Sequence, residues 1–482
     1  MLTRRGCRVA LGVVVLLSVL TLTFGLVTAD RTSDFADTGS HTQAAPPRDG
    51  ITVIATDSNT FLGSAQEGPR SNAELVAFAE DGSTLYYNDS HTRYWDVDPV
   101  EGTNATVEYL YADHLPAEEC NSDSVCTRNG IERVNLTTGN VTDVYSRVTP
   151  GKHSTRWHDG DRLNDTRYVV ADIAQDRVFV VNTSTELVEW SWDAQAAYPR
   201  TSGGPYPEDW THVNDVEVVQ DGRIMASLRN QDQVVFLDRE TGLVENWTLG
   251  EDGDHDTIYE QHNPDYIPAE NGGPAVLVAD SENNRIVEYQ RTDGNWTRSW
   301  TWSDARAQWP RDADRLPNGN TLITDSNGNR VFEVNPQGEV VWSVDVAFPY
   351  EAERLGTGDE STGGQSMQAI GGESSTGDDD SATNGSAGDG GAGPGAGDDD
   401  GAGSTGNTDS AGLLGSLWLA FKGLLPGKVF NALMYVKPIW MGALEVAALV
   451  VGTVSLLVWA VLELRWTPYS VSVQQPLELH RD

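Results

Sequence analysis

The sequence predicts an all-β chain that forms a six-bladed β-propeller ectodomain with N- and C-terminal transmembrane helices. Three observations predict this architecture. A motif recurs at intervals of 54, 50 and 49 residues, and each copy reads as four short strands. Apolar stretches long enough to span a bilayer lie near both ends of the chain. We take the repeats first, because they determine the fold.

Four segments align with one another, and in each an aspartate follows three residues after a leading basic residue. Each segment continues with a turn, an apolar strand, a second turn, an alternating strand and a strand that carries tryptophan. Four strands in about fifty residues is the size of a propeller blade. The segments are Arg156–Leu163, Trp210–Val216, Glu260–Tyr266 and Trp309–Arg315, with the leading positions His158, His212, His262 and Arg311 and the aspartates Asp161, Asp215, Asp265 and Asp314.

Two degenerate copies precede the four clear ones and bring the number of blades to six. They cover Leu75–Tyr111 and Ala112–Val148, and the Cys120–Cys126 loop interrupts the second. A remaining strand, Ile51–Ala55, is expected to complete the last blade and close the ring, which would remove the exposed sheet edges. The predicted propeller therefore spans residues 50–355.

The flanking sequence predicts a membrane-anchored chain with its propeller on the extracellular side of the cell membrane. Arg4, Arg5 and Arg8 precede an apolar stretch that is either an uncleaved anchor or a signal peptide, and such charges keep the N-terminus inside. The expected segments are a cytoplasmic stub with the anchor or signal (1–29), a disordered acidic Gly/Ser/Asp linker (356–411), an interfacial amphipathic segment (412–437), a transmembrane helix (438–464) and a cytoplasmic tail (465–482).

Composition agrees with an exterior location in salt. The chain has 72 acidic and 32 basic residues, a net charge of −40 that concentrated salt would screen, so we expect a halophilic protein. The same charge argues against a nucleic-acid partner. Nine N-x-S/T sequons lie between the two spans and predict a glycoprotein, and Cys120 and Cys126 are close enough in sequence to form a disulfide. Nothing in the sequence indicates an oligomeric state.

Equivalent positions of a propeller gather around its axis, so His158, His212, His262 and Arg311 are predicted neighbours at one mouth of the channel. Three imidazoles and a guanidinium suit an anion, and an imidazole can also act as nucleophile or proton carrier near neutral pH. The pattern therefore predicts an anion site on the axis. Histidines from separate blades, without clustered Cys or carboxylate ligands, do not predict a metal site.

Several motifs resemble the arylsulfotransferase family, in a membrane-anchored form of haloarchaeal type. They are Trp210–Val216, Ser227–Arg229, Leu237–Gly242, Leu249–Gly250, Gln261–His262 and Ala279–Arg285. The resemblance implies transfer of a sulfuryl group from an aryl sulfate donor to a phenolic acceptor through a histidine, without cofactor or nucleotide donor. It assigns His262, His212 and Arg285 to catalysis and, together with the axial positions, assigns Asn214, Arg229, His158 and Arg311 to substrate binding.

One departure from the family leaves alternatives open. The family's nucleophilic histidine is expected downstream of Gln261–His262, where the sequence has only His480, and the last blade offers Arg311 instead. Either His262 or His212 has become the nucleophile, or the protein binds anionic aromatics without turning them over. Arginines recur at the position of Arg285 in other blades, which also fits an inter-blade salt bridge or a turn hydrogen bond.

Two other kinds of propeller compete with the enzyme. Asp280–Arg285 and Asp325–Arg330 also look like NHL repeats, which would make the chain a non-catalytic surface propeller that binds anionic ligands or protein partners. A lactonase-like propeller would need an axial calcium site. By the alignment above, the axial positions supply too few carboxylates for it.

Overall fold

The computed structural model describes residues 3–28, 35–36, 43–57, 73–151, 155–304, 307–371, 375–376, 426–438 and 440–466. These residues form two compact units. One contains the apolar helices near the two ends of the chain, and the other contains the β-sheets together with residues 426–435. Each unit is described by itself.

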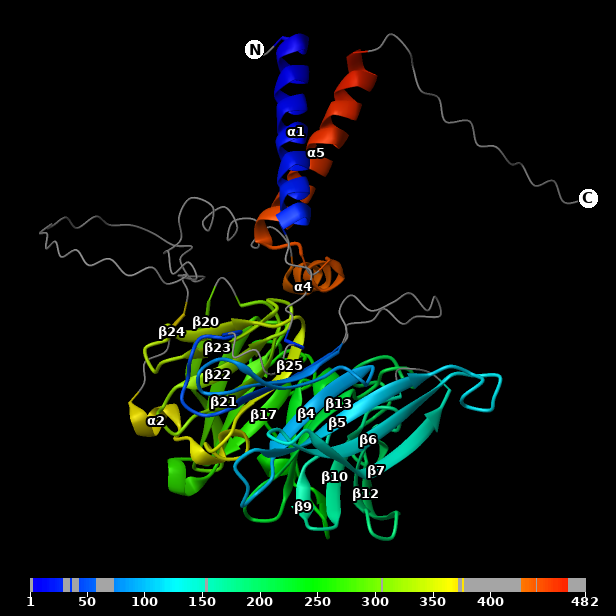
Figure 1. The fold of residues 1–482 in the computed structure, drawn as a ribbon, viewed down its shortest axis with the longest axis vertical. Helices are drawn as coiled ribbons and strands as arrows, with labels where there is room; N and C mark the ends of the chain where they lie inside the picture. Colours follow the sequence, from blue (N-terminus) through cyan, green and yellow to red (C-terminus); the bar gives the residue numbers. More distant parts are fainter. Residues whose placement is uncertain are drawn as a thin grey trace, which may run out of the picture. The chain divides into compact units, whose positions relative to one another are not determined.

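Six antiparallel sheets form the second unit, and the predicted six-bladed β-propeller is confirmed (Figure 1). Five blades use consecutive strands. The first two are β4 (Arg93–Pro99), β5 (Thr106–Leu115), β6 (Cys126–Asn135) and β7 (Asn140–Pro150), then β8 (Trp157–Asp159), β9 (Arg162–Asn164), β10 (Arg167–Asp172), β11 (Arg177–Asn182) and β12 (Leu187–Asp193).

The next three blades follow the same plan, with the innermost strand first. They are β13 (Val213–Val218), β14 (Ile224–Leu228), β15 (Gln233–Asp238) and β16 (Gly242–Leu243), then β17 (His262–Ile267), β18 (Ala275–Asp280), β19 (Arg285–Thr292), β20 (Asn295–Ser303) and the parallel β26 (Ser375–Thr376), and finally β21 (Pro310–Arg315), β22 (Thr321–Asp325), β23 (Arg330–Val334) and β24 (Val340–Asp345).

The sixth blade joins strands from both ends of the propeller. Its order is β25 (Pro349–Arg354), β1 (Thr52–Thr56), β2 (Leu75–Phe78) and β3 (Thr84–Asn88). In the β1–β25 ladder Thr52 pairs with Arg354 and Ile54 pairs with Ala352. The strand predicted at 51–55 therefore does close the ring, but in a blade of its own and not in the last repeat.

The two degenerate copies predicted at 75–111 and 112–148 are wrong. Residues 75–88 supply the outer strands of the closing blade, and residues 93–150 form a single blade. The reason is strand length, because β5, β6 and β7 have 10, 10 and 11 residues whereas β13 to β15 have five or six. One blade with long strands thus uses as much sequence as two short copies.

Acidic residues on the inner strands form two rings around the axis, one residue per blade in each. Each member of the second ring lies two residues after the first-ring member of the same blade. The first ring is Glu351, Asp96, Asp159, Asp215, Asn263 and Asp312, and the second ring is Glu353, Asp98, Asp161, Glu217, Asp265 and Asp314.

Carboxylates of these rings link neighbouring blades by accepting backbone N–H groups of the next inner strand. In each case the donor is the residue that follows the next ring member. The links run from the N–H of Val97 to Glu351 (2.8 Å), of Gly160 to Asp96 (3.1 Å), of Val216 to Asp159, of Val218 to Asp161 (2.6 Å), of Tyr266 to Glu217 (2.7 Å) and of Ala352 to Asp312 (3.1 Å).

The remaining junction, between β17 and β21, is bridged by a residue that follows the ring in sequence. Ser361, in the short helix η5 (Glu360–Gly363), donates its hydroxyl to Asp265 and accepts the N–H of Arg315 at 2.7 Å. Helix α2 (Met367–Ile370) follows, and the N–H of Met367 lies 2.9 Å from Glu288. Residues 356–371, which were predicted to belong to the disordered linker, are therefore part of the propeller unit. Residues 377–411 of the predicted linker lie outside the described part.

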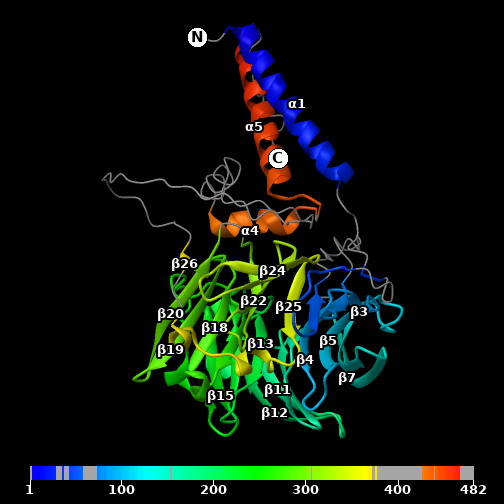
Figure 2. The ribbon, with the colours of Figure 1, turned by 60° about the vertical axis from the view of Figure 1, so that its left-hand side comes forward.

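Helix α4 (Gly427–Val436) lies across one end of the propeller (Figure 2). Its apolar face buries Phe430 and Met434, and Asn431 donates to the Glu282 carboxylate at 3.0 Å. This helix falls within the predicted interfacial segment 412–437, whose residues 412–425 lie outside the described part. The described residues of that segment thus pack on the propeller, whereas an interfacial helix was predicted to lie on the membrane surface.

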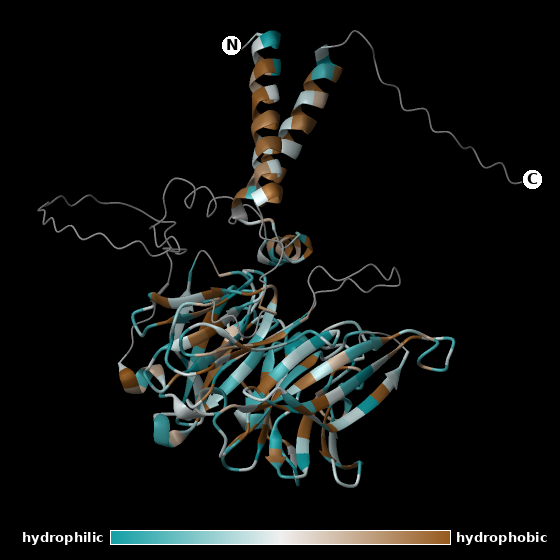
Figure 3. Cartoon of the chain, viewed as in Figure 1, coloured by the Kyte–Doolittle hydropathy of each residue, from teal (hydrophilic) through white to brown (hydrophobic). Residues whose placement is uncertain are grey.

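The other unit contains α1 (Arg4–Thr28) and α5 (Ala443–Trp466), which lie side by side. Both are long and apolar enough to cross a membrane, as predicted, and their surface is mostly hydrophobic (Figure 3). Arg8 contacts Glu463 at 2.6 Å between the two helices. The predicted tail beyond residue 466 lies outside the described part.

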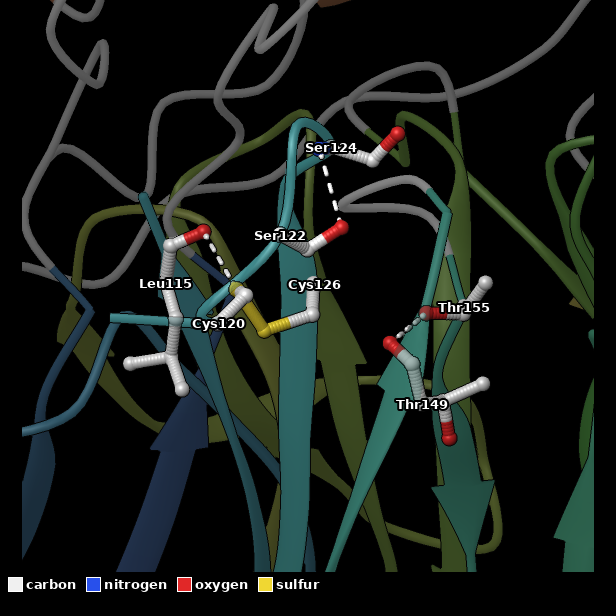
Figure 4. The surroundings of a disulfide bond; sticks show 7 residues. All are labelled: Leu115, Cys120, Ser122, Ser124, Cys126, Thr149 and Thr155. Atoms are coloured by element: carbon white, nitrogen blue, oxygen red, sulfur yellow. Dashed lines mark hydrogen bonds between the residues drawn. A yellow bond between two sulfur atoms is a disulfide. The ribbon is translucent and has the colours of Figure 1, made fainter. Parts of the chain in front are cut away.

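A disulfide joins Cys120 to Cys126, as Figure 4 shows. It connects the loop after β5 to the first residue of β6, and the Cys120 sulfur also contacts the carbonyl of Leu115. The cross-link closes the one long loop that interrupts this blade between its second and third strands.

Ring closure by β1 and β25 generates a stability prediction. Ile54 is fully buried, so Ile54→Ala should lower the free energy of unfolding by about 2 to 5 kcal/mol, although its strand partner lies some 300 residues away. Chemical unfolding of the full chain in detergent measures this loss. The control is Val341→Ala, at a position that is 45% exposed, which should change it by less than about 0.5 kcal/mol. Equal effects of the two changes would contradict a role of this ladder in stability.

Candidate functional site

The four leading positions of the repeats converge on one end of the propeller axis. The rings of His158 and His212 lie 5.3 Å apart between centroids. The ring of His262 lies 6.4 Å from that of Tyr350, and the guanidinium of Arg311 lies 4.8 Å from the same ring. Tyr350 also hydrogen-bonds His158 Nδ1 at 2.9 Å. The structure therefore brings the predicted residues together around one buried tyrosine.

Two members of this group were missed by the sequence analysis, and both come from misassigned blades. Tyr350 starts the inner strand of the closing blade, and Trp95, 4.3 Å from His158, comes from the inner strand of the first blade. Each is followed three residues later by an acid, Glu353 or Asp98, which is the spacing of the four clear repeats. That spacing was the available signal.

Hydrogen bonding fixes the protonation of His262. Its Nδ1 lies 2.8 Å from the Ser281 hydroxyl, which donates its single proton to the carbonyl of Pro310 at 2.7 Å. A hydroxyl that donates in this way accepts from Nδ1–H, and this tautomer has its lone pair on Nε2. Burial and then the charge of Arg311 lower the pKa of His262 well below its ordinary value. The lowered pKa leaves His262 as a neutral imidazole.

His212 lies against two charged residues of opposite sign. Its Nδ1 is 2.6 Å from the Asp209 carboxylate and 3.2 Å from Arg229. The shorter contact, to a carboxylate that can only accept, requires the proton on Nδ1, and the lone pair is again on Nε2. Burial and then the positive charge of Arg229 lower the pKa of His212 to about 4. This imidazole is also neutral at pH 7.

The register of β13 corrects one part of the repeat alignment. Asp161 accepts the N–H of Val218 and Glu217 accepts that of Tyr266, so Glu217, and not Asp215, follows Asp161 in its ring. The alignment placed Asp215 there because it matched His212 to the other leading residues, although His212 precedes its first-ring acid by three residues and His158 precedes Asp159 by one. His212 consequently lies just before its strand, with φ of 49°, and reaches the group from the strand end.

Arginine side chains supply the positive charge of the group. Arg311 is buried and stacks on Trp309, Phe348 and Tyr350, and it contacts Asp57 at 3.5 Å. Arg156, which the sequence analysis did not assign to the site, stacks on Trp95. Burial and then repulsion by Arg93 lower its pKa to about 10, so it stays charged. Neutral imidazoles next to buried guanidinium groups suit an anion.

Arg229 belongs to a chain of charges that reaches α4. Its guanidinium pairs with Glu260, and Lys428 of α4 contacts the same carboxylate. Among the described residues, Arg229 Nε has no acceptor within hydrogen-bonding distance. Arg229, which was predicted to bind the anion, therefore has its Nε–H available as a donor. Its charge is already paired with that of Glu260.

Two predicted site residues make contacts that hold the blades. The Arg285 guanidinium contacts Asp280 at 2.5 Å and the carbonyl of Asp256 at 2.8 Å, as Arg177 contacts Asp172 and Arg330 contacts Asp325 in other blades. The recurring arginines thus form salt bridges within their blades, whereas the sequence had indicated salt bridges between blades. Asn214 donates to the carbonyl of Gln261 at 3.0 Å and so links β13 to the next blade.

A pocket of about 430 Å³ lies beside the group, between α4 and the blades. Arg229 and Asp209, the two polar contacts of His212, line it together with Glu260, Lys428 and Tyr259. Pockets of 300 to 1,000 Å³ are the usual size for small-molecule ligands. The pocket thus reaches the side chains that contact His212.

Comparison with known proteins agrees with the motifs. Residues 140–347, less than half of the chain, match the family model of arylsulfotransferase (ASST). No protein with a curated description matches the chain.

Similar solved structures include propeller enzymes and a protein of unknown function. The latter, from Bacteroides caccae, is 11% identical, covers 63% of this chain and 97% of its own, and has a TM-score of 0.42. The periplasmic gluconolactonase PpgL of Pseudomonas aeruginosa is 14% identical over 64% of this chain and 99% of its own, with a TM-score of 0.40. A catalytically inactive virginiamycin B lyase of Staphylococcus aureus is 7% identical over 62% and 86%, with a TM-score of 0.36.

The contact between Arg229 and His212 generates a prediction on titration. Arg229→Gln removes the charge that lowers the pKa of His212, so the pKa should rise toward its ordinary value. Because the folded pKa of about 4 lies below that of the unfolded chain, the stability contributed by His212 is present above pH 6.5 and is lost as the pH falls toward 4.

Histidine NMR titration of the full chain measures this pKa. Arg330→Gln is the matched control, because it removes an arginine that pairs with Asp325 in another blade. An equal shift of the His212 pKa in both variants would contradict the geometry.

Proposed function

We propose that the protein is an arylsulfotransferase-like enzyme that transfers a sulfuryl group from an aryl sulfate to a phenolic acceptor. The observation that carries this proposal is the protonation of two imidazoles. Both His262 and His212 are neutral and have their lone pair on Nε2, and buried guanidinium groups lie next to them. The match of residues 140–347 to the arylsulfotransferase model supports the same class of reaction.

His262 is the nucleophile in this proposal. Its Nε2 attacks the sulfur of the donor, the bond from sulfur to the aryl oxygen breaks, and the phenolate leaves with the electron pair and takes up a proton. In the second half the acceptor's phenolic oxygen attacks the same sulfur, the N–S bond breaks, and the acceptor loses its proton. His262 is then regenerated, and no nucleotide or cofactor takes part.

Positive charge stabilises the transition state of such a transfer, because negative charge spreads over the sulfonate oxygens. Arg311, Arg229 and Arg156 are charged donors whose Nε atoms lack an acceptor among the described residues. His212, paired with Asp209, is placed to exchange the phenolic proton. In this proposal the pocket lined by Tyr259 and Lys428 holds the aryl ring of the donor.

A second candidate is a propeller that binds anionic ligands without turnover. The observation that favours it is the chain of contacts from Arg229 to Glu260 and Lys428, which already shares the charge of the arginine. Arg285, assigned to catalysis by the resemblance, is likewise engaged by Asp280. Such a protein would bind an aryl sulfate and release no phenol.

Activity of the full chain on 4-nitrophenyl sulfate with a phenol acceptor tests the first candidate. His262→Ala and His212→Ala should each lower the rate of nitrophenol release at least about 100-fold, since each removes a group that acts on the reacting atoms. Thermal unfolding of each variant shows whether the fold is retained.

A matched pair of variants separates the two roles of Arg285. By its contacts, Arg285→Gln should affect the rate no more than Arg330→Gln, which removes the equivalent salt bridge of another blade. Nitrophenol release that is unaffected by both histidine changes would reject the catalytic proposal. Binding without release would favour the second candidate.

We also propose that α1 and α5 anchor the chain in the cell membrane, with the propeller outside. The arginines that precede α1, the sequons and the Cys120–Cys126 disulfide support this orientation. Labelling of intact cells with a membrane-impermeant amine reagent should then modify Lys428, as mass spectrometry detects. Modification of this lysine only after lysis would place the propeller inside.

A further inference from the structure

The two acidic rings concentrate negative charge at the centre of the propeller, at a place that the repeat alignment had judged poor in carboxylates. Eleven of their twelve members are acids, and Asn263 is the exception. All the ring residues except the half-buried Asp161 are buried, and Asp265 and Asp312 are 0% and 1% exposed. Among the described residues, no Lys, Arg or His forms an ion pair with a ring carboxylate. Buried charge of this kind requires compensation.

The links between blades use only part of the hydrogen-bonding capacity of the rings. Where the next ring member is followed by proline, no N–H exists, which happens at Pro264 and at Pro99. Asp215 Oδ2 and both oxygens of Glu353 accordingly lack a donor among the described residues. The same is true of Asp96 Oδ1, Asp265 Oδ1, Asp312 Oδ1 and Asp314 Oδ2.

Helix η5 adds another acid to this end of the channel. Glu360 has φ of 50°, and its carboxylate comes close to acids of several blades. Two groups of carboxylate oxygens, each lying within 4.8 Å of one another, share it. The groups are Asp96, Asp98, Glu351 and Glu360, and Asp265, Asp312, Asp314 and Glu360.

An amide provides a second and independent indication of a ligand. Asn263 is 4% exposed, and its Nδ2 donates to Glu351 at 3.1 Å. Its Oδ1, on the same planar amide and therefore next to that carboxylate, has no donor among the described residues. Calcium takes carboxylate and amide oxygens together. A buried neutral oxygen without a donor, next to unpaired carboxylates, suits a cation.

We propose that the acidic rings bind calcium on the propeller axis, with Glu360 as the shared ligand of the two oxygen groups. This inference does not depend on the proposed sulfotransferase activity. The donor set supports calcium, because calcium takes six to eight oxygens from carboxylates and amides in a flexible arrangement, whereas magnesium usually keeps several waters and one or two carboxylates. The ion would tie η5 to the inner strands of four blades.

Shared protons are the alternative means of neutralising these acids. Burial, reinforced by neighbouring carboxylates, raises the pKa of Asp265, Asp314 and Glu360 well above the ordinary value. A cluster neutralised by protons would bind no calcium and would keep the same Tm when calcium is added. A calcium site would bind the ion and raise the Tm. The two therefore predict opposite results in one experiment.

The experiment uses the purified full chain in detergent, stripped with EGTA and dialysed against calcium at pH 7 and fixed salt. We expect one or two calcium ions bound per chain by elemental analysis, and a Tm higher by about 5 °C or more than in EGTA. Glu360→Gln should lose the bound calcium and the rise in Tm. The control Asp293→Asn, at an exposed turn with φ of 52°, should retain both.

Two results would overturn the proposal. One is a wild-type chain that binds less than about 0.1 calcium ion and whose Tm is the same in calcium and in EGTA. The other is calcium binding that Glu360→Gln leaves unchanged, which would assign the ion to the acidic surface. The wild-type measurements stand by themselves if Glu360→Gln does not fold.

Discussion

Hydrogen bonds from ring carboxylates to the backbone of the next inner strand hold the blades of this propeller in order. Inner strands of neighbouring blades do not pair as β-ladders, so their backbone N–H groups need other acceptors. Glu351, Asp96, Asp159 and Asp312 supply them at the first ring, and Ser361 completes the second ring where no direct link exists. The position of every inner strand depends on these contacts.

The histidine group depends on the same contacts, since its members begin the strands that the rings align. His158 precedes Asp159 by one residue, and Tyr350 precedes Glu351 by one. Each carboxylate that fixes a neighbouring blade thereby also fixes the side chain at its end. The axis has opposite character at its two levels, with guanidinium groups around neutral imidazoles at one and unpaired carboxylates at the other. The proposed anion site and the proposed calcium site thus lie at different levels of one channel, where the charge has opposite sign.

The sequence predicted the number of blades and the convergence of the leading residues, because blades share a period and propellers bring equivalent positions to the axis. It did not predict where the ring closes, since the long strands β5 to β7 resemble two short copies. Trp95 and Tyr350 were missed for that reason. The register of β13 was also missed, because a motif matched by residue type does not show that His212 lies two residues further from its ring acid than His158 does.

The acidic rings show a different limit of sequence reasoning. The aspartates were visible only as repeat positions. Alternate residues of an inner strand face the axis, so Asp159 and Asp161 both contribute, but the alignment considered only one of each pair. Because the alignment counted one acid per blade, it underestimated the number of carboxylates that the closed ring brings to the axis.

Closure by β25 has a consequence for the order in which this protein can assemble during synthesis. The partner of β1 is the last strand of the ring to leave the ribosome, so β1 keeps an open edge while almost 300 further residues are made. Five blades can fold in succession as they emerge, but the circle stays an open arc until residue 354. A nascent chain that stalls before this point presents an unpaired strand that other chains can join.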